Sequence, residues 1–91
     1  GNQETEDEVE PIVFNQIKIY PNPSNGIFMV SLNDLSKGTI QITNLLGQTV
    51  FNSNFRNQNE LEINMQDKSK GIYLVKVNSN NQVYTSKIIK K

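Results

Sequence analysis

YPNPSNGIFMVSL, residues 20–32, is the stretch that decides the fold. Pro21 and Pro23 cannot donate a hydrogen bond to a sheet and favour extended backbone before them, so a first strand ends near Tyr20. Asn25-Gly26 tolerates the positive φ angles of a tight turn and starts the chain again. Residues 27–32 then place Phe28, Val30 and Leu32 on one face of an extended segment. This stretch predicts a β-rich domain.

Period-two alternation recurs along the rest of the chain, and helical periodicity is nowhere sustained. Polar segments rich in Asn, Ser and Gly separate the alternating stretches. Gly47 and Gly71 lie where turns need glycine conformations. The expected strands are 12–20, 26–32, 39–45, 48–55, 60–65, 71–78 and 82–90.

Two of these strands have well-defined faces. In residues 60–65, Leu61, Ile63 and Met65 fall on the inward side. The strand that starts at Gly71 is apolar on both sides, with Tyr73, Val75 and Val77 on one face and Ile72 and Leu74 on the other. We therefore expect this strand to be central and covered on both faces.

Seven short strands without a helix or repeat predict an all-β, seven-stranded antiparallel β-sandwich of the immunoglobulin-like kind; a small barrel is the alternative. A chain of 91 residues with 35% hydrophobic content has room for one core. Residues 1–11 are acidic and too polar to offset the entropy of ordering, which predicts a flexible linker before a domain at 12–91. Gly1 is expected to be a residue left from an expression vector.

Charge and composition exclude several functions. From Pro11 onward, four acids stand against nine Lys and Arg, about +5 net, but no basic stripe interleaved with aromatics indicates a nucleic-acid partner. No apolar run approaches the roughly 18 residues of a membrane span, so we expect no direct membrane insertion. Without His or Cys, the chain lacks imidazole bases, thiolates and the common zinc ligands. We expect no cofactor, no metal and no enzyme activity.

Five motifs occur in one order along the chain. They are IYPNP at 19–23, Gly26-x-Phe28, LLGQ at 45–48, KGIYLVKV at 70–77 and KIIKK at 87–91. Together they closely resemble the type A C-terminal sorting domain of the type IX secretion system. The resemblance covers about residues 17–91, and the ordered set is specific although each motif alone is weak.

This resemblance implies a noncatalytic module at the carboxyl end of a secreted protein of a Gram-negative bacterium. N-terminal cargo domains would reach the periplasm by their own signal. The outer-membrane translocon, or a shuttle protein, would read the domain as an address. A sortase-like peptidase would then remove it, leaving the cargo anchored at the cell surface or released.

The resemblance also selects candidate site residues. Translocon recognition is expected at Pro21, Asn22, Pro23, Gly26, Gly47, Gly71, Tyr73, Lys87, Ile88, Ile89, Lys90 and Lys91. Cleavage is expected in the linker, at Glu8, Val9, Glu10, Pro11, Ile12 and Val13, because proteases favour unstructured segments. We expect the proline loop to orient the sandwich near the linker. The residues that decide binding to the translocon are expected at the opposite, carboxyl-terminal end of the chain.

Each of these residues also has a purely structural interpretation. Turn chemistry alone explains residues 21–26, Gly47 and Gly71, and Tyr73 fits a core position with its hydroxyl bonded at the rim. Lysines in residues 87–91 protect an edge strand from aggregation, yet a partner could add a strand at that edge. Dimerisation through exposed edges also stays open.

A second functional class is an appended immunoglobulin-like adhesion or carbohydrate-binding module. Such modules expose a row of aromatics or a calcium loop for sugar. This chain has no Trp and needs most of its seven aromatic residues inside, so the sequence favours the sorting domain. Strong binding of the isolated domain on a glycan array would favour the alternative. A small hydrolase is disfavoured by the missing bases.

Overall fold

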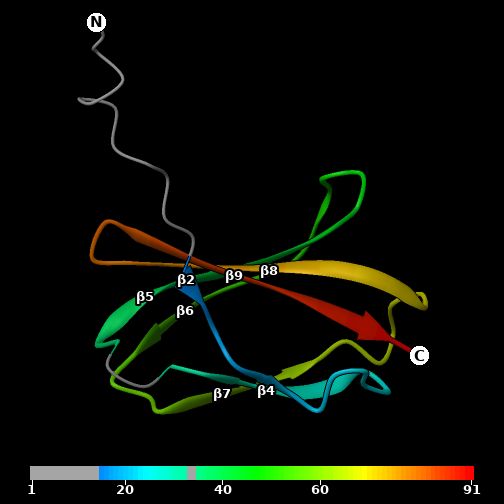
Figure 1. Ribbon diagram of the computed structural model, residues 1–91, viewed down its shortest axis with the longest axis horizontal. Coiled ribbons are helices and arrows are strands. Elements are labelled where there is room, and N and C mark those ends of the chain that lie inside the picture. Colours follow the sequence, from blue (N-terminus) through cyan, green and yellow to red (C-terminus); the bar gives the residue numbers. More distant parts are fainter. Residues whose placement is uncertain (1–14, 33–34) are drawn as a thin grey trace, which may run out of the picture.

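The computed structural model describes residues 15–32 and 35–91. Within these ranges the chain forms strands and no helix (Figure 1). The strands are β2 (Asn15–Gln16), β3 (Ile19–Tyr20), β4 (Ile27–Ser31), β5 (Lys37–Asn44), β6 (Thr49–Arg56), β7 (Glu60–Asn64), β8 (Gly71–Ser79) and β9 (Gln82–Lys90). The predicted all-β fold is confirmed, and this part of the chain contains no helix that could cross a membrane.

The strands form two sheets, which Figure 1 shows as two layers. The larger sheet has the order β2-β9-β8-β5-β6, and the smaller has the order β3-β4-β7. Neighbouring described strands run antiparallel, as predicted, except that β2 runs parallel to β9. Consecutive strands β5 and β6, and β8 and β9, are hairpins.

The core lies between the two sheets. Alternate residues of each strand point inward, as period two requires, and the inward side chains are buried, except that Leu61, also predicted inward, is half-buried. The buried side chains are Phe28, Val30 and Leu32, then Ile40 and Ile42, then Ile63 and Met65, then Tyr73, Val75 and Val77. Phe55 and Ile88 complete the buried cluster. Burial of each large apolar side chain stabilises the fold by about 1.5–3 kcal/mol, so the alternation in the sequence is what selects this packing.

The expected first strand, 12–20, is wrong in one respect. Asn15–Gln16 pairs with β9 in the larger sheet, whereas Ile19–Tyr20 pairs with β4 in the smaller one. The chain crosses between the layers at Ile17 and Lys18, and Ile17 packs against the core on the way. Residues 15–32 and 35–91 consequently contain eight strands where seven were expected. Residues 12–14 lie outside the described ranges.

The expectation that β8 is covered on both faces is also wrong. β8 is central, between β9 and β5, but the smaller sheet covers only its inner face. Ile72 is 38% exposed and Leu74 is 46% exposed on the outer face. The apolar residues on both sides of this strand therefore do not indicate burial on both sides.

Gly38, expected in a loop, lies within β5. A Cβ at this position would overlap the main-chain carbonyl oxygen of Asn78 on β8 and touch the ring of Phe55 on β6. The absence of a side chain lets three strands meet closely at this end of the larger sheet. β5 accordingly begins at Lys37, two residues earlier than the alternation suggested.

Candidate partner-recognition site

The proline loop, residues 21–26, lies along the end of β9. The Asn22 side-chain amide donates from Nδ2 to the carbonyl oxygen of Lys87 at 2.8 Å, and its Oδ1 accepts from the amide of Ile89 at 3.0 Å. The Ser24 amide donates to the Ile89 carbonyl, and the Lys91 amide donates to the Ser24 carbonyl, each at 2.8 Å. The loop thus satisfies the backbone groups that β9 would otherwise expose at this edge.

Ser24 and Gly26 anchor the loop from beneath. Ser24 is buried, and its hydroxyl donates to the Ile27 carbonyl at 2.8 Å and accepts from the Gly26 amide at 3.0 Å. Gly26 has φ +123°, and a Cβ there would lie 2.9 Å from the Gln66 Cα. Its carbonyl accepts from the Met65 amide. The loop is therefore held against β7 as well as β9, and it joins the two sheets.

β8 supports the same end of β9. Gly71 lies opposite Lys90 in the ladder, and Tyr73 lies opposite Ile88. Tyr73 and Ile88 are both buried, and the Tyr73 hydroxyl donates to the Ser69 carbonyl at 2.6 Å. The prediction of a core tyrosine bonded at the rim is confirmed.

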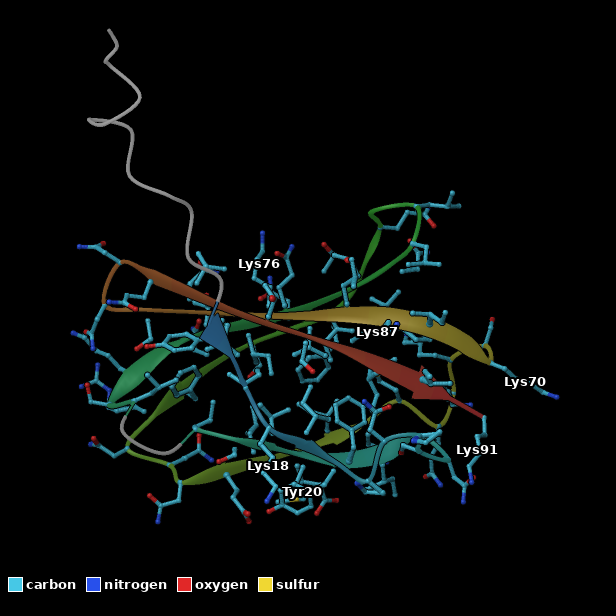
Figure 2. The ribbon with its side chains drawn as sticks, viewed as in Figure 1. Lys18, Tyr20, Lys70, Lys76, Lys87 and Lys91 are labelled. Atoms are coloured by element: carbon cyan, nitrogen blue, oxygen red, sulfur yellow. The ribbon has the colours of Figure 1, made fainter. Side chains whose placement is uncertain are left out.

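The surface around this loop is positively charged. Lys87 is exposed on the outer face of β9, and Lys90 and Lys91 lie beside Ser24. Figure 2 shows Lys70 and Lys91 at this same end of the sandwich and Lys87 over the larger sheet. A partner that binds here meets several cations within a small area, which favours an acidic surface.

The structure brings together most of the predicted recognition residues. We call them the loop–strand site: Pro21, Asn22, Pro23, Gly26, Gly71, Tyr73, Lys87, Ile88, Ile89, Lys90 and Lys91. Gly47 lies apart, at the tip of the β5–β6 hairpin with φ +88°. The proline loop and the end of β9 are far apart in the sequence but lie side by side at this site; where a partner binds stays a prediction.

The loop–strand site differs from a free edge strand. Asn22 and Ser24 form hydrogen bonds with the backbone groups of residues 87–91 that point away from β8. A partner that adds a strand here must first displace the loop. The exposed groups of the loop–strand site are instead Pro21, Asn22, Pro23, Gly71 and the side chains of Lys87, Ile89 and Lys91.

The sequence alone did not identify three residues: Ser24, which anchors the proline loop, and the exposed Leu45 and Leu46. Ser24 looked like an ordinary turn residue, since its role depends on a strand more than sixty residues away. Leu45 and Leu46 belong to the quoted motifs, but an apolar pair beside a strand normally indicates burial. In the structure they are 65% and 85% exposed. The predicted cleavage residues, Glu8 to Val13, lie outside the described ranges.

The described surface lacks the usual features of a catalytic, metal or sugar site. No group of three or more His, Cys, Asp or Glu residues capable of holding a metal occurs within 15–32 and 35–91. A hollow of about 880 Å³ opens near the β8–β9 turn, lined by Lys37, Arg56 and several amide side chains without a carboxylate. The aromatic side chains within the described ranges are buried or half-buried, so they offer no exposed stacking row.

Comparison with known proteins gives a consistent result. The family described as "Secretion system C-terminal sorting domain" matches residues 18–91. An endo-acting ulvan lyase of Formosa agariphila is 33% identical over 82 residues, 88% of this chain. An ulvan lyase of Nonlabens ulvanivorans is 37% identical over 75 residues, 80% of this chain. The matched chain spans only 16% and 14% of the length of these two relatives.

Proposed function

Because this chain belongs to the family of secretion system C-terminal sorting domains, we propose that it acts as a noncatalytic export address for cargo domains that precede it in a longer protein. The type IX machinery carries such proteins through the outer membrane to the cell surface or the medium. The two ulvan lyases support this view, since each shares with this chain a segment that is a small fraction of its own length. A secreted polysaccharide lyase is accordingly our first candidate for the cargo.

We propose further that the translocon or its shuttle protein reads the loop–strand site. The observation that carries this proposal is the convergence of motifs from both ends of the chain on one positively charged end of the sandwich. Gly47 is the exception and forms a separate part of the recognised surface. Recognition of folded geometry would let the machinery test that the domain has folded before export, because the loop and β9 meet only in the folded state.

We propose the remaining steps of export and cleavage from the resemblance of the sequence to sorting domains. The cargo passes through the periplasm, and a sortase-like peptidase then cuts within Glu8–Val13. Residues 1–11 form the linker, and residues 12–91 form the sorting domain. Support comes from the acidic, weakly apolar composition of 1–11.

We infer an immunoglobulin-like topology for the sandwich. In the constant-type fold, one sheet carries the first, second, fourth and fifth strands, and the other carries the third, sixth and seventh. The orders β3-β4-β7 and β2-β9-β8-β5-β6 agree with this arrangement if β2 and β3 together form the first strand, with one difference: the fourth strand, β6, lies beside β5 in the larger sheet. A solved structure of a relative with a different strand order would contradict the assignment.

A fusion experiment tests the export function. Residues 1–91 are joined to the carboxyl end of a reporter that carries a periplasmic signal, in a host with a type IX secretion system. We expect the reporter at the cell surface or in the medium, and in the periplasm when the translocon gene is deleted. A reporter that stays in the periplasm of the intact host would refute the proposal.

A matched variant tests the loop–strand site separately. Lys87→Glu with Lys91→Glu reverses two exposed charges without removing a main-chain bond. We expect export of this fusion to fall while its circular dichroism and melting temperature stay unchanged. Lys18→Glu in the segment between β2 and β3, where the lysine lies over the Tyr20 ring, serves as the control and should leave export intact.

A further inference from the structure

Exposed apolar side chains are concentrated on one side of the molecule. Among the described residues, the large exposed hydrophobics are Ile27, Leu45, Leu46, Ile72, Leu74 and Ile89. Ile72, Leu74 and Ile89 share the outer face of the larger sheet, because Ile72 pairs with Ile89 and both alternate with buried neighbours. Ile27 alone belongs to the smaller sheet. Such clustering marks an interaction surface more often than chance exposure.

The β5–β6 hairpin adds two leucines to this side. Figure 1 shows the hairpin rising from the larger sheet, away from the smaller one. The ladder between β5 and β8 ends with Thr43 opposite Leu74 and Asn44 opposite Tyr73, and Leu45 follows in the turn. A hollow of about 370 Å³ lined by Thr43, Leu74, Val75, Lys76 and Thr85 lies at the base of the hairpin. This concavity is apolar through Leu74 and Val75, and the hairpin that carries Leu45 and Leu46 rises beside it.

The hairpin tip is held rigidly. The Asn44 Oδ1 accepts from the amides of Leu46 at 2.9 Å and Gln48 at 3.0 Å, and its Nδ2 donates to the Gln48 Oε1 at 2.8 Å. The Gly47 amide donates to the Asn44 carbonyl at 3.0 Å. Leu46 is 85% exposed in this fixed geometry. A rigid tip loses little conformational entropy when its leucines bind in a pocket.

Cations flank this concavity. Lys87 lies opposite Leu74, and Lys76 follows Leu74 on the same face of β8. Figure 2 shows Lys76 pointing outward from the larger sheet. The described side-chain carboxylates lie elsewhere, Glu60 and Glu62 on β7 and Asp67 in the turn after it. The surface therefore complements apolar side chains with carboxylates beside them.

We propose that this face, formed by Leu45, Leu46, Ile72, Leu74 and Ile89 with Lys76 and Lys87, docks onto a protein segment that carries apolar and acidic side chains. The inference rests on the export function proposed above and places the partner on the secretion machinery. Leu45 and Leu46 insert into an apolar pocket of the partner, and the lysines pair with its carboxylates. The face adjoins the loop–strand site through Lys87 and Ile89, so one partner can cover both. The leucines at the hairpin tip have no charged neighbour within residues 44–50, so they suit an apolar pocket of a protein.

The export fusion tests this face with variants that do not enter the core. Leu45→Ser with Leu46→Ser should lower export about tenfold or more, since one lost leucine contact weakens binding by roughly that factor. Leu45→Met with Leu46→Met keeps apolar volume and should restore export. Ile27→Ser, at a residue of the smaller sheet that is 40% exposed, is the control and should export normally. Each purified domain is checked by its melting temperature.

The outcomes separate the two proposals. If the unmodified fusion is not exported, the export function fails; if it is exported and the double serine variant is exported equally, only the docking face fails. A reduction by Ile27→Ser equal to that of the leucine variant would also overturn the docking face. Lys76→Glu tests the charge of the face and should lower export of the fusion. An unchanged export rate would contradict an acidic partner.

Other occupants of the face are tested on the isolated chain, which has no cysteine of its own. A spin label at Glu6→Cys that broadens the methyl signals of Leu45 and Leu46 would place residues 1–11 on this face and overturn the proposal. A dimer in sedimentation that dissociates in the double serine variant would assign the face to a second copy and overturn it as well. A monomer with unbroadened methyl signals supports a partner from outside the chain.

Discussion

Asn22 shows how one side chain can take the place of a strand. Its amide carries a donor and an acceptor, and it binds the Lys87 carbonyl and the Ile89 amide as a neighbouring peptide group would. Aspartate lacks the donor, and alanine lacks both groups. The sequence motif was interpreted as turn chemistry, which is correct for Gly26 with its positive φ. The role of Asn22 was not predictable, because its partners are separated from it by 65 and 67 residues.

Replacing Asn22 by alanine should lower the free energy of unfolding by about 1–3 kcal/mol, since two hydrogen bonds of about 0.5–1.5 kcal/mol each are lost. Urea denaturation followed by circular dichroism measures the change. Asn52→Ala is the control, as Asn52 is exposed on β6, and it should change stability by less than about 0.5 kcal/mol. Equal stability of the two variants would show that the Asn22 bonds contribute nothing to the fold.

The elements were predicted well where alternation is local and poorly where pairing is remote. The bounds of β4 and β6 to β9 follow the alternating pattern closely. The crossover between β2 and β3 was missed, because Ile17 and Ile19 keep the same period while the chain changes sheets. Gly38 was assigned to a loop, because a glycine between polar residues gives no local sign of the carbonyl that approaches it. Both errors concern contacts between distant segments.

β9 contributes both to the proposed recognition site and to the stability of the fold, so its deletion cannot separate the two roles. Removal of Ile88 to Lys91 takes away a buried isoleucine, its pairing with Tyr73, and the bonds from Ile89 and Lys91 to the proline loop. Loss of the Ile88 side chain alone should cost about 2–5 kcal/mol, which is a large share of the roughly 5–15 kcal/mol that holds a domain together. We expect the deletion variant to lack the β-sheet signal in circular dichroism.

Deletion of Lys91 alone is the companion variant. It removes one backbone bond, to Ser24, so the domain should stay folded with a modestly lower melting temperature. A folded, fully stable 88–91 deletion would contradict the packing of Ile88. Charge reversal at Lys87 and Lys91, in the fusion described above, is the experiment that isolates recognition from folding.

At the scale of the whole molecule, charge is separated along the chain and over its surface. Residues 1–10 hold five acids and no base, whereas Lys70, Lys87, Lys90 and Lys91 lie around the end of β9 and Lys76 lies on the outer face of the larger sheet. The sequence predicted the first separation but not the second, because the second depends on which strand face each lysine occupies. Likewise the family motifs predicted the site residues, and only the fold shows that most of them meet.

A glutamate-specific protease should distinguish the linker from the domain. Glu4, Glu6, Glu8 and Glu10 precede the described pairing, which begins at Asn15, whereas Glu60 and Glu62 pair with Ser31 and Met29 between β7 and β4. Backbone held in a sheet does not enter a protease cleft readily, so we expect rapid cuts after the first group and slow cuts after the second. Intact-mass spectrometry over time would then show a stable fragment that begins at Val9 and ends at Lys91, since the Glu10–Pro11 bond resists cleavage. Cleavage after Glu60 or Glu62 as fast as after Glu8 would contradict both the ordered sheet and the placement of the cleavage segment before it.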